Sequence, residues 1–292
     1  MAERRVIFDF EIVFSNGGAI QGQGFRLDIE GDEVTDEELA DEVVRELNLL
    51  MVERVIISNK SYVDEPHKRG RVAAGTGLVD LSHPIRDGMI TYPGLPEPKL
   101  RAHLSREDSR ANYAEGTEFH IGAIDMVGNT GTYIDSPFHR YADGVDLAGL
   151  PLDRLVGLPG VVVDAEETAI GPEAFADIET WGMAVLIRTG WDSRFGGDDY
   201  LGAHPHITEA AAQRLVDGGA ALVGIDSANI DATTGGTRPA HSLLLRAGIP
   251  LVEHLARLDQ LPDGPFEFFA IPAPVIGLGT LPVRAVARWG TA

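Results

Sequence analysis

The sequence predicts an α/β protein in which a small β-β-α-β unit precedes a larger domain. One observation is the strand-like alternation of apolar and polar side chains over residues 6–13. Another is the change after residue 78 to short apolar strands that alternate with helical stretches, which favours an α/β or α+β sheet core. Between them lies a polar stretch with Pro66 and Gly70, typical of a linker. The predicted boundaries are 1–63 for the small unit, 64–75 for the linker and 76–292 for the main domain.

The small unit is built from local signals along the first 63 residues. Gly17 and Gly18 mark a turn between strand 6–13 and a second strand near 19–29. Thr35 followed by Glu38 has the spacing of a capping box at the start of a helix. Four apolar residues then share one helical face: Leu39, Val43, Leu47 and Leu50. A strand over 54–58 completes the unit, which is too small to bury much core by itself.

The main domain shows eight strand candidates and two helices. The strands are expected at 78–81, 119–127, 159–163, 183–188, 221–226, 249–252, 268–271 and 282–287. One helix should span about 208–217, with Thr208 as its N-cap and Gly218 at its end. The other should start near Pro239 and stop at Gly248, the order in which helices favour these two residues.

Composition narrows the function classes. The chain has 24 Lys and Arg against 45 Asp and Glu, a formal charge of −21 that would repel a phosphate backbone, so nucleic-acid binding is excluded as the main activity. The absence of cysteine rules out thiolate catalysis and cysteine-ligated zinc. We find no apolar run of membrane-spanning length and no secretory signal pattern, and therefore expect a cytoplasmic protein without a membrane partner.

The most informative segment for chemistry is 128–140, GNTGTYIDSPFHR. Alternate residues of a strand face the same way, so Tyr133 and Asp135 could flank one ligand. Asn129 would join them only if the chain bends, and Gly131 provides a place for a bend. Pro137 cannot donate to a sheet ladder, so the strand should end there and place His139 in the following loop.

A second set of polar residues lies downstream. His241 opens a candidate helix and Glu253 ends a candidate strand, and such positions often present site residues on a rigid scaffold. His, Glu and Asp side chains suit a borderline divalent ion such as zinc or manganese. Spacing alone does not identify a metal site, and we assign no role to Asp226 or Asp231.

Several short motifs, taken in order, carry a resemblance to a known family. They are DLSHPI (80–85), YPG (92–94), the 128–140 segment, GIDS (224–227), PAH (239–241), VEHL (252–255) and PVRAVA (282–287). Over about residues 76–289 the sequence resembles the cyclase family that includes bacterial kynurenine formamidase and isatin hydrolase. The resemblance implies a swivelling β/β/α domain, a homodimer or homotetramer, and hydrolysis of amide bonds with one or two divalent ions.

The resemblance also implies roles for individual residues. The metal-binding Asp of the family matches Asp135 and its catalytic His matches His139, while two further ligands match His241 and Glu253. Two family histidines are replaced, the first by Asn129 and the second by Tyr133. Amide and phenol oxygens bind zinc less readily than imidazole does, so the resemblance supports one ion held by three protein ligands, or no ion at all.

Three hypotheses about function follow. The first is a hydrolase of a small amide, cyclic amide or lactone, in which His139 acts as general base and acid and Tyr133 donates to the developing oxyanion. The second is a metal-free lyase, dehydratase or cyclase that uses Tyr133, Asp135 and His139 for proton transfer. The third is a ligand-binding pseudoenzyme. We expect Asn129, Phe138 and Trp191 to contact a small-molecule substrate.

Three other histidines have less direct interpretations. His120, on the strand before the segment, is a candidate replacement for a missing metal ligand. His204 and His206 flank a proline beside a predicted helix start, which predicts an exposed loop rather than a metal pair.

Overall fold

The computed structural model describes residues 3–15, 17–28, 34–46, 52–65 and 77–290. The chain divides into two units, Met1–Arg71 and Val72–Ala292. The predicted linker therefore lies largely outside the described residues, as do Leu47 and Leu50 of the predicted helical face.

The first unit is an antiparallel sheet of order β2-β1-β3 packed against one helix. Its elements are β1 (Glu3–Phe14), β2 (Ala19–Asp28), α1 (Asp36–Glu46) and β3 (Val52–Glu65). Alternate residues of β1 from Val6 to Ile12 meet Leu39 and Val43 of α1 in a small apolar core. The capping box is confirmed, since Thr35 N–H donates to Glu38 and Glu38 N–H donates to Thr35 Oγ1.

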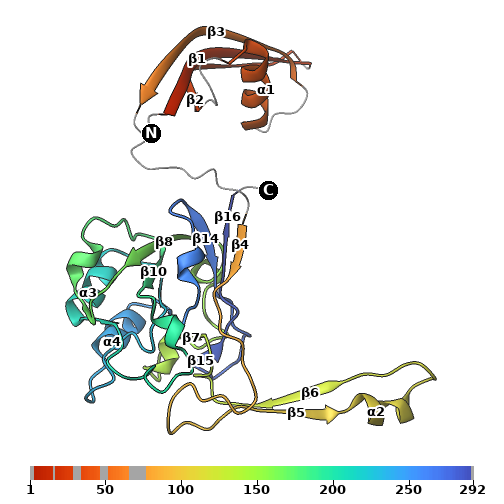
Figure 1. The fold of residues 1–292 in the computed structure, drawn as a ribbon, viewed down its shortest axis with the longest axis vertical. Helices are drawn as coiled ribbons and strands as arrows, with labels where there is room; N and C mark the ends of the chain where they lie inside the picture. Colours follow the sequence, from red (N-terminus) through yellow and green to blue (C-terminus); the bar gives the residue numbers. More distant parts are fainter. Residues whose placement is uncertain (1–2, 16, 29–33, 47–51, 66–76, 291–292) are drawn as a thin grey trace. The chain divides into compact units, whose positions relative to one another are not determined.

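The second unit contains a nine-stranded mixed sheet of order β15-β7-β13-β12-β10-β8-β14-β16-β4 (Figure 1). Four central strands run parallel: β8 (Leu158–Asp164), β10 (Ala184–Arg188), β12 (Leu222–Ile225) and β13 (Leu251–Glu253). The other five pair in antiparallel fashion: β4 (Gly77–Asp80), β7 (Tyr133–Asp135), β14 (Phe266–Phe269), β15 (Thr280–Pro282) and β16 (Val286–Trp289). Short parallel strands β9 (Ala169–Ile170) and β11 (His206–Ile207) form a separate pair.

Each face of this sheet covers its own apolar core. Val185 and Ile187 of β10 belong to the core that contains α3 (Glu209–Asp217) and α4 (Pro239–Arg246). Leu186, between them, belongs to the opposite core with Phe268. Buried apolar side chains on both faces explain why the parallel strands read as continuous apolar runs. Thr208 caps α3 through a hydrogen bond from Ala211 N–H, as predicted.

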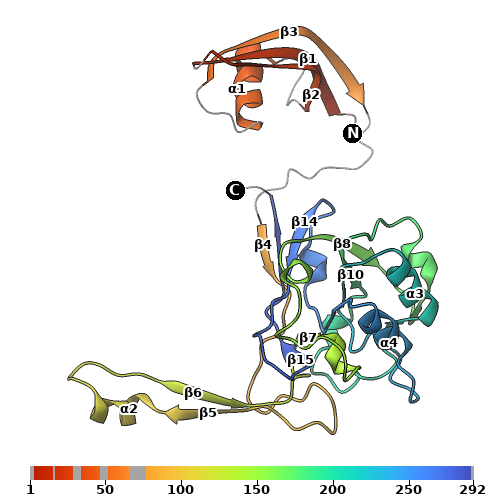
Figure 2. The same cartoon turned by 180° about the vertical axis from the view of Figure 1, so that it is seen from behind.

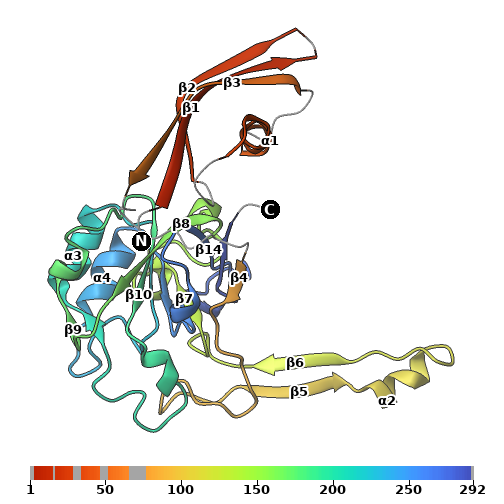
Figure 3. The ribbon, with the colours of Figure 1, turned by 45° about the horizontal axis from the view of Figure 1, so that its top comes forward.

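A two-stranded arm, β5 (Lys99–Leu104) with β6 (Ile121–Asp125), extends from the second unit (Figures 2 and 3). The short helix α2 (Arg106–Ser109) follows β5. Of the two strands in this arm, the sequence predicted only β6, because β5 has no clear alternation of apolar residues. None of the helices in the described ranges is long and apolar enough to cross a membrane.

Candidate active site

Strand β7 holds the centre of the site because it lies between β13 and β15. The pairing places Asp135 opposite Thr280 of β15, and Thr280 donates its hydroxyl proton to Asp135 Oδ1 at 2.5 Å. Asp135 is fully buried. Its other oxygen, Oδ2, has no hydrogen-bond partner among the described residues. Buried carboxylate oxygens are rarely left unpaired, so this atom points to a ligand.

His139 follows Asp135 at the end of a short 3-10 helix, Pro137–His139. Strand β7 ends before Pro137, as predicted, but Pro137 begins this short helix where a loop was expected. The Nδ1 atom of His139 lies 2.7 Å from Thr280 Oγ1. Because the Thr280 proton goes to Asp135, His139 must donate from Nδ1, which leaves Nε2 as a proton acceptor. The His139 side chain is 34% exposed, so this acceptor is accessible to a substrate.

Glu253 comes from the C-terminal end of β13, directly opposite Tyr133 of β7. Ile230 N–H donates to its Oε1 at 2.7 Å, and the Tyr133 hydroxyl donates to its Oε2 at 2.5 Å. Burial raises the pKa of Glu253 to about 7, although the charge of His241 opposes that rise.

His241 lies in the first turn of α4 and is oriented by Asp231. The Asp231 carboxylate accepts hydrogen bonds from the backbone N–H groups of Ala240 and His241. It also lies 2.7 Å from His241 Nδ1, so one side chain both caps the helix and holds the imidazole. A carboxylate behind a histidine is the usual support for a metal-binding imidazole.

Three carboxylates surround His241: those of Asp135, Asp231 and Glu253. Burial lowers the pKa of His241, but the negative charges of Glu253 and Asp135 and the hydrogen bond with Asp231 outweigh burial and raise it to about 10. Without a cation, a proton on His241 would therefore balance the buried carboxylates, and a divalent ion would have to displace it.

The arrangement fits one divalent ion. Asp135, His139 and His241 each present a ligand atom within 4.8 Å of the others. His241 Nε2 lies 3.7 Å from Asp135 Oδ2 and 3.7 Å from Glu253 Oε1. Ligands about 2.1 Å from a tetrahedral zinc ion are about 3.4 Å apart, so small shifts would complete the coordination.

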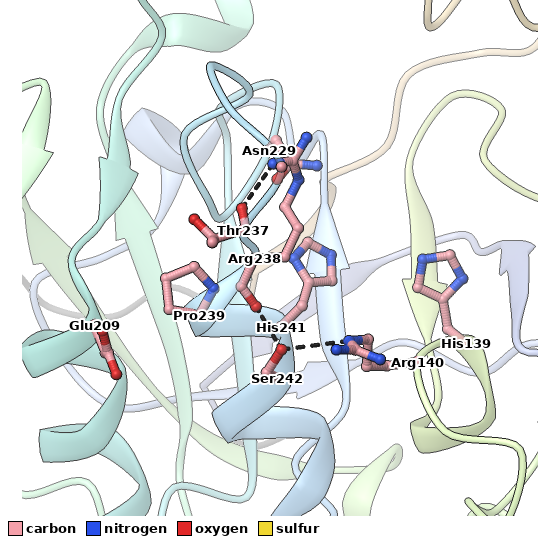
Figure 4. A pocket seen from close by; sticks show the side chains of 10 residues that line it. His139, Arg140, Glu209, Asn229, Thr237, Arg238, Pro239, His241 and Ser242 are labelled. Carbon is pink, nitrogen blue, oxygen red and sulfur yellow. Dashed lines mark hydrogen bonds between the residues drawn. The ribbon is translucent and has the colours of Figure 1, made fainter.

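A cavity of about 660 Å³ opens in front of these groups (Figure 4). Its walls include His139, Arg140, Asn229, Arg238, His241 and Ser242. Figure 4 shows His139 and His241 on separate elements at this cavity. Its charged lining consists of the two arginines and one carboxylate, that of Glu209.

The other predicted site residues lie elsewhere. Tyr133 is only 1% exposed and lies behind Glu253, so its hydroxyl is directed at that carboxylate. Trp191 donates from Nε1 to the Tyr200 carbonyl, with Arg194 over its ring. In the described part of the chain Asn129, Phe138 and Trp191 are not among the residues that line the cavity. Gly131 has the left-handed φ of 66° that the expected bend requires.

The predictions for His120 and His204 have different outcomes. His120 is exposed and lies just before β6 of the arm, outside the cluster that could hold a metal. The prediction of an exposed loop for His204 is wrong: the residue is 2% exposed, with Nδ1 3.2 Å from Ser227 Oγ. A proline indicates a turn, but it does not indicate whether that turn is buried or exposed.

Sequence reasoning missed the residues that support the ligands. Asp231 and Thr280 lie ten residues from His241 and 145 residues from Asp135, respectively. Asp231 had a usable signal, since it precedes a helix whose N-cap residue, Arg238, has a side chain that cannot accept a hydrogen bond from the backbone. Thr280 had none, because its role depends on the pairing of β7 with β15.

Comparisons with known proteins identify the family of the chain. The Cyclase family model matches residues 79–232. The kynurenine formamidase of Geobacillus thermodenitrificans is 32% identical over 212 residues, which cover 72% of this chain and 96% of that protein. The kynurenine formamidase of Salinibacter ruber is 30% identical over 213 residues, covering 72% and 97%.

Solved structures show the same fold over the second unit. Isatin hydrolase A from Labrenzia aggregata, bound to benzyl benzoate, has a TM-score of 0.62 at 26% identity, covering 73% of this chain and 93% of that one. A protein named "Potential Metal-Dependent Hydrolase With Cyclase Activity" has a TM-score of 0.60 at 28% identity, covering 73% and 98%. The predicted α/β fold and the family resemblance are thus confirmed.

Proposed function

Because the chain belongs to the cyclase family, we propose that it is a hydrolase of a small amide, cyclic amide or lactone that works with one divalent ion. The relatives named as kynurenine formamidases and isatin hydrolase support the reaction class. The substrate and the choice between zinc and manganese are parts of the proposal.

One observation carries this proposal: the unpaired, fully buried Asp135 Oδ2 faces His241 Nε2, while Asp231 fixes the other side of that imidazole. An acidic cluster alone would not indicate an ion. An unsatisfied carboxylate oxygen, a supported imidazole and Glu253 Oε1, 3.7 Å from that imidazole, match a three-ligand catalytic site.

When bound, a divalent ion supplies Lewis-acid polarisation of a carbonyl and lowers the pKa of water toward neutrality. His139 then has the proton-transfer role. Its free Nε2 accepts a proton from the attacking water and returns it to the leaving nitrogen or oxygen. Thr280 keeps the imidazole in this tautomer by accepting from Nδ1 and donating to Asp135.

The cavity walls favour a substrate that carries a carboxylate. Arg238 is held by three backbone carbonyls through Nη1: those of Ala232, Gly235 and Thr237. Arg140 contacts Ser242 Oγ through Nε at 3.3 Å. The remaining N–H groups of both guanidinium ions are suited to an anionic group beside the scissile bond.

Metal analysis of protein purified without chelators tests the proposal. Wild type should contain about one equivalent of zinc or manganese, the stoichiometry of a single three-ligand site. Asp135→Ala should lose both the ion and the hydrolysis of amide or lactone substrates. Full activity in protein stripped of metal would contradict the proposal.

One observation favours a metal-free alternative. The raised pKa of His241 would let an imidazolium ion balance Asp135 and Glu253 without a metal. Proton transfer by a lyase, dehydratase or cyclase would then fall to Asp135 and His139, because Tyr133 donates to Glu253. Wild-type turnover by Glu253→Ala would favour this alternative.

A further inference from the structure

A column of polar side chains lies behind Glu253. It runs from Glu253 through Tyr133 and Tyr92 to His254 and Tyr200. The hydroxyls of Tyr92 and Tyr133 are 3.0 Å apart, His254 Nε2 is 3.1 Å from the Tyr92 hydroxyl, and His254 Nδ1 is 2.7 Å from the Tyr200 hydroxyl. At most 2% of Tyr133, His254 or Tyr200 is exposed.

The backbone brings Tyr133 and His254 close to Glu253. Strand pairing sets Tyr133 directly across from Glu253. His254, the next residue, has a left-handed φ of 55°, a conformation that is uncommon outside glycine. Residues held in such conformations are over-determined by their surroundings and cluster at functional sites. Here the conformation places the His254 ring between two tyrosine hydroxyls.

The proton on each group follows from its partners. Tyr92 donates to the Ala228 carbonyl, so its oxygen accepts from His254 Nε2. The neutral imidazole of His254 then accepts the Tyr200 proton at Nδ1. Tyr133 has one proton and donates it to Glu253 Oε2. Tyr92 and Tyr133 therefore each donate to another acceptor, and no proton lies between their two hydroxyls.

The two oxygens of Glu253 have different hydrogen-bond partners. Oε2 accepts from the Tyr133 hydroxyl, with Asn229 Nδ2 at 3.5 Å. Oε1 accepts one backbone N–H from Ile230 and keeps a lone pair on the side of His241, 3.7 Å away. A cation near Oε1 would meet that lone pair, whereas a cation near Oε2 would meet a hydroxyl proton.

We propose that Tyr133 is a positioning residue that anchors Glu253 through Oε2 and leaves Oε1 as the oxygen that holds a single divalent ion. This inference rests on the proposed function, since it assumes that Glu253 is a metal ligand. It assigns to Tyr133 a role in ion affinity rather than direct contact with substrate.

Titration of metal-free protein with zinc or manganese, followed by direct binding measurements, tests the inference. Wild type should saturate at one ion per chain. Tyr133→Phe should still saturate at one ion but bind it about 10- to 100-fold more weakly, the usual effect of losing a group that orients a ligand. Tyr113→Phe is the matched control, because Tyr113 is 45% exposed and contacts Phe119 far along the chain from Glu253.

Two further comparisons keep the test decisive. Tyr92→Phe removes the neighbouring hydroxyl but keeps the hydrogen bond from Tyr133 to Glu253, so it should bind the ion about as tightly as wild type, and equal weakening in both variants would contradict the inference. A merely structural role would lower the melting temperature of the metal-free protein without changing ion affinity, so both are measured.

The outcomes separate this inference from the proposed function. Two ions per wild-type chain, or unchanged affinity in Tyr133→Phe, would overturn the inference and leave a metal-dependent hydrolase standing. No ion bound by wild type would overturn both.

Discussion

The two sides of Glu253 differ in how their polar atoms are used. On the cavity side, Asp135 Oδ2 is unpaired and His139 Nε2 is available as an acceptor. On the buried side, the hydroxyls and ring nitrogens from Tyr133 to Tyr200 have partners. Binding capacity thus lies on the cavity side, while the buried side fixes the geometry of the ligand shared by both. This division makes distinct predictions for the two sides.

The largest effect is expected for His139→Ala on the cavity side. Loss of a general base and acid should lower kcat about 10²- to 10⁴-fold. Because His139 acts on protons in this mechanism, the ion content measured by elemental analysis should stay at the wild-type level. Loss of the ion in this variant would instead make His139 a ligand, as its place in the Asp135 and His241 cluster allows.

Asp231→Asn should produce the next largest effect. Asparagine can still accept from the backbone of α4, but it lacks the charge that supports the His241 imidazole. Ion affinity, measured by competition with a chelator, should fall about 10- to 100-fold.

Asp226→Asn is the matched control for Asp231→Asn. Asp226 is equally buried, at 1% exposed, but its carboxylate accepts from Thr189 and Gly190 rather than from His241. Equal losses of ion affinity in both variants would show that buried charge in general, and not support of His241, is responsible.

Arg238→Ala should have a smaller effect that depends on the substrate. Loss of one charged hydrogen bond costs about 1.5–3 kcal/mol, so kcat/KM for a carboxylate-bearing amide should fall about tenfold or more. The same measurement with a neutral amide should show little change. Arg246→Ala is the control, because it removes a nearby arginine that does not line the cavity. Equal losses for both substrates would argue against a carboxylate subsite.

The smallest effect concerns stability on the buried side. Burial lowers the pKa of His254 to about 3. The unfolded chain takes up a proton near pH 6.5 and the folded chain does not, so the free energy of unfolding should fall by about 1.4 kcal/mol for each unit by which the pH is lowered from 6.5 toward 3. Above pH 6.5 this histidine should contribute no pH dependence.

Urea unfolding of wild type and His254→Asn measures this slope. All three tryptophans belong to residues 76–292, so their fluorescence reports on the domain that contains His254. Asparagine tolerates the left-handed backbone and does not titrate. Its slope below pH 6.5 should therefore be shallower than that of wild type, and identical slopes would contradict the prediction.

Local patterns in the sequence determined the elements that form from neighbouring residues. The capping box at Thr35, the N-cap at Thr208 and the helix that begins at Pro239 depend on contacts within a few positions. The bend at Gly131 and the end of β7 before Pro137 belong to the same class. The order of motifs, through their resemblance to a family, also identified Asp135, His241 and Glu253 as a group.

Only the tertiary structure decided which groups surround these residues. The pairing of β7 with β13 and β15 sets Tyr133 against Glu253 and Thr280 against Asp135, across 120 and 145 residues of chain. The choice of β13 and β15 as neighbours of β7 depends on packing across the whole sheet, which the local alternation of side chains does not specify. For that reason the sequence could indicate Tyr133 as a site residue, while its direction, toward Glu253 and away from the cavity, followed from the fold.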